Sequence, residues 1–110
     1  MTVTYIRFYV QENRQHHHHL VYEWLLAQAK KMGIHGGSAF RAIAGYGRHG
    51  ILHEAHFIEL QGDLPVMIEF VVSEQEEEAL LALLRDEKLS LLYVRFAADS
   101  GLTWDGNPDS

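Results

Sequence analysis

Residues that can bind an anion or a metal gather in positions 44–56, AGYGRHGILHEAH, which contain three glycines, one arginine and three histidines. Glycines let backbone amides approach an anion closely, and an arginine adds a planar cation with several hydrogen-bond donors. The segment lacks the Lys-Ser/Thr pair of a P-loop, and no helix follows at the spacing of a dinucleotide fingerprint. Residues 45–50 therefore suit either a phosphate-binding loop or an ordinary hairpin loop.

A second group of histidines occupies residues 15–20, QHHHHL. Imidazoles two residues apart in an extended chain, or three apart in a helix, suit zinc, nickel or copper. We take His17 and His19, together with His53 from the glycine-rich segment, as candidate ligands of a divalent metal. A metal site also needs a third ligand and outer hydrogen-bond partners, which the run alone does not supply. The alternative is an exposed loop that leads into a helix.

Composition excludes several classes of protein. The chain has 110 residues, no cysteine and a formal charge of −6, so we expect one domain without disulfides or thiolate metal sites. Nucleic acid is not an expected partner, because phosphate contacts need a basic face. No apolar run approaches the ~20 residues of a membrane span, and the N-terminus is not a signal peptide, so we expect a cytoplasmic protein. No nucleophile elbow or Ser/His/Asp order is present, and we predict that the protein is not an enzyme.

Hydrophobic periodicity predicts four strands and two helices. A period of two, or a short apolar run between glycines or turns, predicts strands at 3–10, 38–45, 65–72 and 89–97. A further short extended segment is expected at 55–61. Helical spacing marks residues 20–33, where Gly33 is placed to end the helix. Ser73 and Glu76 form the signature of a capping box that begins the second helix.

The predicted order β-α-β-β-α-β indicates an α+β, ferredoxin-like βαββαβ sandwich, an antiparallel sheet with both helices on one face. We expect the domain to span 1–97, and 98–110 to form a partly ordered tail in which Trp104 docks. The uncovered sheet face would be partly apolar, as expected of an oligomer interface. Its predicted residues are Tyr5, Arg7, Tyr9, Met67, Glu69 and Val71.

Two longer stretches, GIHGGSAFRAIAGYGRHGILHEA and LPVMIEFVVSEQEEEALLALL, resemble the PII-like proteins collected as the domain of unknown function 190 family. The resemblance runs from about residue 4 to residue 96. It implies a ferredoxin-like homotrimer whose sheets pack inward, with clefts between subunits that bind an adenine nucleotide such as AMP, ADP or ATP. It also implies a regulatory role toward a membrane transporter or channel.

The resemblance assigns ligand-binding roles to a small set of residues. Gly45, Gly47 and Arg48 match the glycine-aromatic-glycine segment, and His49 follows directly. Two further positions that the resemblance implies are Ser38 and Arg95. The segment 46–64 is much shorter than the signalling loop of PII proteins, and RDEKLS replaces their basic phosphate loop, leaving Lys88 as its stand-in. The main alternative is a metal-binding, metal-tolerance trimer of the same fold that uses the histidine clusters.

Overall fold

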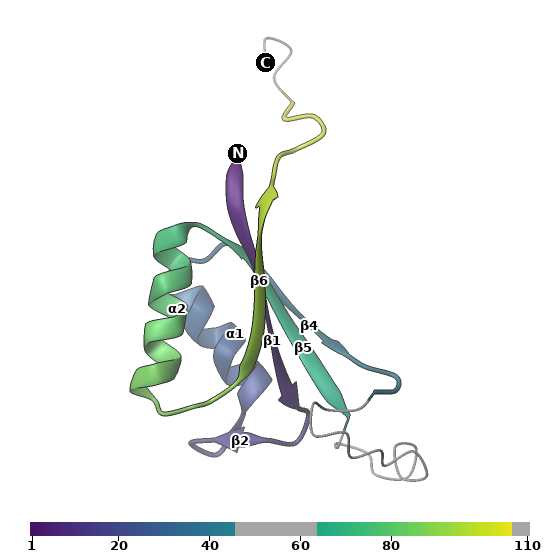
Figure 1. Cartoon of the computed structure of the whole chain (residues 1–110), viewed down its shortest axis with the longest axis vertical. Helices are drawn as coiled ribbons and strands as arrows, with labels where there is room; N and C mark the ends of the chain where they lie inside the picture. Colours follow the sequence, from purple (N-terminus) through teal and green to yellow (C-terminus); the bar gives the residue numbers. More distant parts are fainter. Residues whose placement is uncertain (46–63, 107–110) are drawn as a thin grey trace.

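The computed structural model describes residues 1–45 and 64–106, which form a four-stranded antiparallel sheet with two helices packed on one side (Figure 1). The strand order is β4-β5-β1-β6. The strands are β1 (Thr2–Gln11), β4 (Gly37–Arg41), β5 (Pro65–Val72) and β6 (Leu92–Asp99), and the helices are α1 (Val21–Lys31) and α2 (Glu74–Asp86). The predicted ferredoxin-like sandwich is therefore confirmed. The extended segment expected at 55–61 lies outside the described residues.

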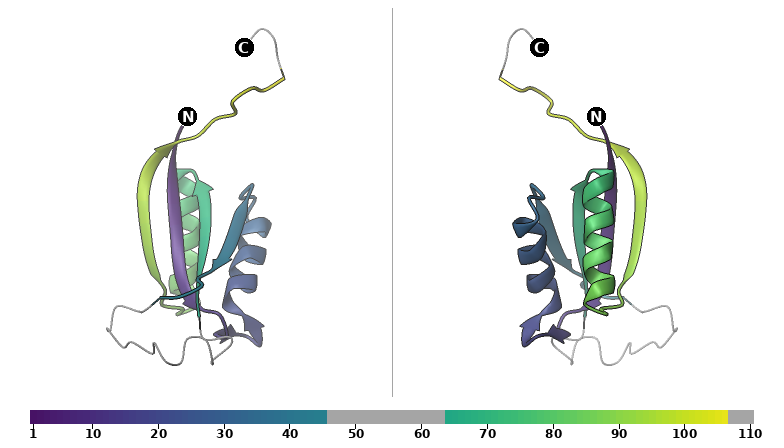
Figure 2. Two further views of the ribbon diagram at one scale, coloured as in Figure 1. Left: turned by 90° about the vertical axis from the view of Figure 1, so that its right-hand side faces the viewer. Right: turned by 90° about the vertical axis from the view of Figure 1, so that its left-hand side faces the viewer.

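The core forms because the two central strands alternate strictly between a buried and a partly exposed face. On β1, Ile6 and Phe8 are fully buried and point toward the helices. Their antiparallel partners on β5 are Phe70 and Ile68, and cross-strand partners lie on the same face of a sheet. Both helices close over this face, as the two side views show (Figure 2). The helices thereby leave the opposite face of the sheet open.

Local sequence signals determine where the two helices begin and end. The Ser73 hydroxyl accepts a hydrogen bond from the Glu76 backbone N–H at 3.1 Å, and the Glu76 carboxylate accepts one from the Ser73 N–H at 2.8 Å. This reciprocal capping box satisfies two backbone donors that α2 would otherwise leave open. The first helix ends at Lys31, and Gly33 follows with a φ of 87°, a left-handed conformation that glycine adopts without steric cost. Both predicted helix boundaries are confirmed.

Two predicted strands are present with shifted bounds. The strand expected at 38–45 ends at Arg41, and the chain leaves the sheet after one last hydrogen bond from the Ala42 N–H to the Pro65 carbonyl. The strand expected at 89–97 begins only at Leu92, because a turn ends α2 and buries Leu89. In that turn Lys88 has a φ of 54°.

The start of β1 and the end of β6 lie side by side at one end of the sheet, where Met1 and Ser100 exchange backbone hydrogen bonds (Figure 1). The chain then runs away from the domain, and Trp104 is 74% exposed. The prediction that Trp104 docks is therefore wrong for the single chain. Neither α1 nor α2 is long and apolar enough to cross a membrane.

Candidate functional site

The side of the sheet away from the helices, which we term the open sheet face, carries large apolar side chains. Register places Phe96, Val94 and Leu92 of β6 opposite the outward-facing residues of β1, and each of these three side chains is 45–48% exposed. The face consists of Tyr5, Arg7, Tyr9, Ser38, Phe40, Met67, Glu69, Val71, Leu92, Val94 and Phe96. The six residues predicted from sequence all belong to it, and β4 and β6 extend it to both edges.

A polar network lies at the centre of the open sheet face. The Arg7 guanidinium lies over the Tyr5 ring at 5.1 Å from its centroid, and Nη1 donates to the Tyr9 hydroxyl at 3.4 Å. Tyr5 donates its own hydroxyl proton to Glu69 and stacks on Phe96 with ring centroids 4.9 Å apart. Buried Arg7 Nε finds no hydrogen-bond partner among residues 1–45 and 64–106. A buried donor without a partner is costly.

The candidate ligand-binding residues other than Arg95 fall into three groups. Ser38 lies on edge strand β4, on the open sheet face and opposite Glu69. Gly45 is the last residue described before the segment 46–63, and among the described residues a Cβ there would meet the Pro65 ring at 3.5 Å. The segment's other ligand candidates, Gly47, Arg48 and His49, lie outside the described residues, and their predicted role stays a prediction.

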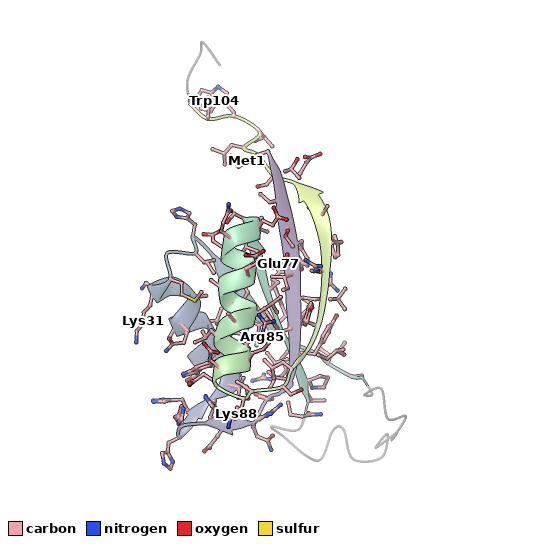
Figure 3. All side chains as sticks on the ribbon, turned by 60° about the vertical axis from the view of Figure 1, so that its left-hand side comes forward. Met1, Lys31, Glu77, Arg85, Lys88 and Trp104 are labelled. Carbon is pink, nitrogen blue, oxygen red and sulfur yellow. The ribbon has the colours of Figure 1, made fainter. Side chains whose placement is uncertain are left out.

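Arg95 lies on the other face of the sheet, toward the helices. It pairs across strands with Ile6, and its Nη1 donates to the carboxylate of Glu77. Glu77 lies on α2, on the side of the sheet that the helices cover (Figure 3). The Glu77 side chain is 4% exposed, whereas that of Arg95 is 56% exposed. Arg95 is thus the counter-ion of a buried carboxylate and still reaches solvent. Its role toward a ligand stays a prediction.

The sequence reasoning missed Glu77, because it assigned the acidic residues that follow Ser73 only to helix capping. The signal was present: Glu77, Leu80 and Leu84 are spaced by three and four residues, so they share one helix face. All three are buried. A carboxylate on a buried helical stripe requires a cation from another element. Arg95 is that cation.

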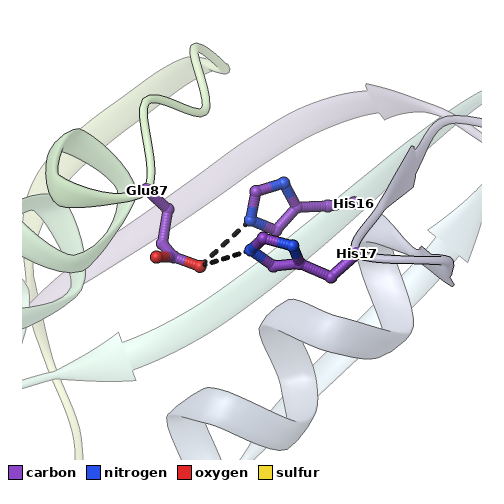
Figure 4. A network of polar contacts seen from close by, with 3 residues as sticks. All are labelled: His16, His17 and Glu87. Carbon is purple, nitrogen blue, oxygen red and sulfur yellow. Dashed lines mark hydrogen bonds and ion pairs between the residues drawn. The ribbon is translucent and has the colours of Figure 1, made fainter.

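The histidine run forms a hairpin in which β2 (Gln15–His16) pairs with β3 (His19–Leu20). Nε2 of His16 lies 3.1 Å from Oε1 of Glu87, and Nε2 of His17 lies 3.2 Å from the same oxygen (Figure 4). The hydrogen bond from His16 is the main reason why the pKa of Glu87 lies below its ordinary value. Burial raises this pKa, but the hydrogen bond from His17 lowers it further, and the net shift is downward. Two imidazoles and a carboxylate from distant segments therefore share one small volume.

Of the two predicted metal ligands that the structure describes, His17 joins this group. His19 is the cross-strand partner of His16 but does not belong to the cluster, and His53 lies outside the described part of the chain. Glu87 was missed because it is 70 residues from His17, and no local pattern reports such a contact.

Comparison with known families gives one match over most of the chain. The model of the family DUF190, described as "Uncharacterized ACR", matches residues 3–94. A UPF0166 protein of Aquifex aeolicus is 32% identical over 71 residues, which are 64% of this chain and 68% of that protein. A UPF0166 protein of Methanocaldococcus jannaschii is 31% identical over 70 residues, which are 64% of each chain. The match thus spans just under two thirds of the latter protein.

Two solved structures of PII-like proteins share this fold. A putative PII-like signaling protein from Thermus thermophilus superposes with a TM-score of 0.60 at 16% identity, covering 88% of this chain and 86% of that one. CPII from Thiomonas intermedia, bound to ADP and bicarbonate, superposes with a TM-score of 0.63 at 20% identity, covering 93% and 91% of the two chains. At this level of identity the comparison establishes a shared fold.

Proposed function

This chain belongs to the DUF190 family, and from that premise we propose that it is a non-catalytic, PII-like regulatory protein that binds an adenine nucleotide. The observation that carries the proposal is the likeness to CPII, which covers more than nine tenths of both chains in its form bound to ADP and bicarbonate. Two features of the described residues support the same proposal: the sheet has one uncovered face, and candidate ligand residues lie on its edge strands.

We propose that the working unit is a homotrimer whose open sheet faces pack together. Phe40, Val94 and Phe96 are each 45–49% exposed in the single chain, and contiguous apolar patches of this kind mark interaction surfaces. Further copies of the chain would bury these side chains.

The position of the ligand candidates supports a cleft between subunits. Ser38 lies on β4 and Arg95 on β6, the two opposite edges of the sheet. Three strand spacings separate these edges, about 14 Å at the usual strand separation, and the two residues belong to opposite faces. One nucleotide therefore cannot lie between Ser38 and Arg95 of the same chain, but it can lie between the edges of two neighbouring chains. In that cleft, Arg48 and Arg95 would neutralise phosphate charge, while Gly45 and Gly47 would let the backbone approach the phosphate groups closely.

The nucleotide proposal is tested by calorimetry of untagged protein with ADP, AMP and ATP. We expect saturable binding of at least one nucleotide and a loss of at least tenfold in affinity for Arg48→Ala. Arg85→Ala is the matched control, since it removes an exposed arginine from α2, and we expect it to bind like the parent. No binding of any of the three nucleotides would overturn the proposal, and unchanged binding by Arg48→Ala would overturn the assigned phosphate contact.

The trimer is tested by light scattering after size-exclusion chromatography. We expect the parent to have three times the mass of the chain, and Val94→Asp to be smaller, because it places three carboxylates against the apolar interface. Gln75→Asp, on the exposed side of α2, is the control and is expected to remain a trimer. A monomeric parent would refute this part of the proposal.

We further propose that the cytoplasmic trimer reports its nucleotide state to a membrane transporter or channel, as the family resemblance implies. The expected result is that immobilised protein captures one transport protein from solubilised membranes, in an amount that changes when ADP is added. Capture that does not respond to any nucleotide would contradict nucleotide-dependent regulation.

A further inference from the structure

The contact between the β2–β3 hairpin and the end of α2 brings three potential metal ligands together. One ring nitrogen of His16, one ring nitrogen of His17 and a carboxylate oxygen of Glu87 all lie within 4.8 Å of one another. Each imidazole nitrogen lies 3.1–3.2 Å from Glu87 Oε1. Zinc binds histidine nitrogen and carboxylate oxygen at about 2.0–2.2 Å in tetrahedral geometry, so two of its ligands lie about 3.4 Å apart. The nitrogen–oxygen distances in this cluster are therefore within a few tenths of an ångström of those in a zinc site.

The backbone of the hairpin explains why two consecutive histidines point to the same place. Successive side chains of an extended strand point to opposite faces. Here His17 has a φ of 51° and His18 a φ of 68°, the left-handed conformation typical of two-residue hairpin turns. As a result the rings of His16 and His17 lie side by side, with centroids 4.0 Å apart.

Packing holds the three residues in position. The His16 side chain is 15% exposed, and its ring meets the Trp24 ring edge-on, with centroids 4.8 Å apart. Glu87 is the C-cap residue of α2, and its backbone N–H donates to the Leu83 carbonyl. His17 is 67% exposed, which gives an ion access from solvent. Two ligands are thus positioned by folded elements, and the third faces the solvent.

We propose that His16, His17 and Glu87 bind a divalent transition metal ion, zinc being the best match. Two imidazoles and one carboxylate are a donor set that zinc accepts with a fourth position left for water. In the metal-free protein both Nε2 atoms hydrogen-bond Glu87. Because a carboxylate only accepts hydrogen bonds, each Nε2 carries a proton in that state. On metal binding a neutral imidazole shifts to the Nδ1–H tautomer, and a doubly protonated one releases its Nε2 proton to solvent, so that Nε2 can coordinate the ion. The site would join the hairpin to α2, and it does not depend on the nucleotide proposal.

The test is calorimetry of the untagged full chain with zinc chloride, followed by nickel, copper and ferrous iron. We expect one zinc ion per chain. Glu87→Gln and His17→Asn should each bind zinc at least tenfold more weakly than the parent. Asparagine is chosen at position 17 because it tolerates a positive φ. His16→Phe keeps an aromatic ring against Trp24 but removes the ligand nitrogen, so it should also bind zinc at least tenfold more weakly than the parent. Circular dichroism establishes that each variant is folded.

Two matched controls separate this site from nonspecific chelation by the histidine run. Asp86→Asn changes the charge next to Glu87, and His19→Asn removes a histidine of the same hairpin that lies outside the cluster. Both should bind zinc within twofold of the parent. The proposal is overturned if zinc does not bind, if Glu87→Gln binds like the parent, or if His19→Asn weakens binding as much as His17→Asn does.

Discussion

Replacing Arg95 by methionine should destabilise the fold, because it leaves the Glu77 carboxylate buried without its counter-ion. Glu77 has a side-chain exposure of 4%, and its other oxygen, Oε1, has no hydrogen-bond partner in the described part of the chain. Arg95 is therefore the group that compensates for removing this charge from water. Methionine retains much of the length and apolar packing of the arginine stem but provides no hydrogen-bond donor.

The magnitude follows from the unequal burial of the two partners. Removing one member of a fully buried ion pair costs about 3–5 kcal/mol, whereas fully exposed pairs contribute about 0–1 kcal/mol. Arg95 is 56% exposed, so water solvates part of the pair and the expected loss lies between these limits, at about 2 kcal/mol. Glu77→Met should cost much less, because it removes the buried charge and leaves an arginine that solvent can reach.

Urea unfolding at pH 7 and fixed protein concentration measures this asymmetry. With a urea m-value of about 1–3 kcal/mol/M, Arg95→Met should lower the unfolding midpoint by roughly 1 M, and the double variant Glu77→Met/Arg95→Met should recover most of that loss. Equal effects of the two single variants would refute the reasoning, as would a loss below about 0.5 kcal/mol for Arg95→Met. Calorimetry of Glu77→Met with ADP then tests the proposed ligand role, since freeing Arg95 should preserve or strengthen phosphate binding.

Three further predictions concern single positions. Gly37→Ala should destabilise the fold by about 1–3 kcal/mol, because a Cβ would overlap the buried Phe70 ring. A Cβ on Gly36 would meet no described residue within 4 Å, so Gly36→Ala is the control for thermal unfolding. Ser73→Ala should cost about 1 kcal/mol in urea unfolding through loss of the helix cap. Glu87 has a lowered pKa in the folded protein, so its stabilising contribution is present above the ordinary carboxyl value of 4.5 and is lost as pH falls through the folded value. The difference in Tm between the parent and Glu87→Gln should therefore shrink as the pH falls from 6 to 3.

The fold could be predicted from sequence because its signals are local. The alternation of residues 3–10 and the apolar run at 65–72 identify the two central strands, and the Ser73–Glu76 box begins α2 at the expected residue. Strand ends were less well predicted. The start of β6 depends on Lys88 adopting a positive φ, which its side chain does not favour and which no local pattern indicates.

The candidate site was less predictable because its contacts join distant segments. Glu77 and Arg95 are 18 residues apart, and His16 and Glu87 are 71 residues apart. Residue types alone indicated that an arginine and a group of histidines were available for chemistry, but they did not indicate which carboxylate each would meet. The hairpin that turns His17 toward His16 also depends on an unusual backbone conformation, for which asparagine or glycine is the ordinary sequence signal.

The sheet order links the proposed ligand site to the proposed assembly. Ser38 and Arg95 lie on the outer strands of one sheet, so any ligand that touches both must be shared by two chains. Nucleotide binding and subunit association would then stabilise each other, because a ligand that binds only the assembled form shifts the equilibrium toward it. Val94→Asp leaves every candidate ligand residue in place and changes only the open sheet face. Loss of nucleotide binding in this variant would place the cleft between subunits, whereas retained binding by a folded monomer would place it within one chain.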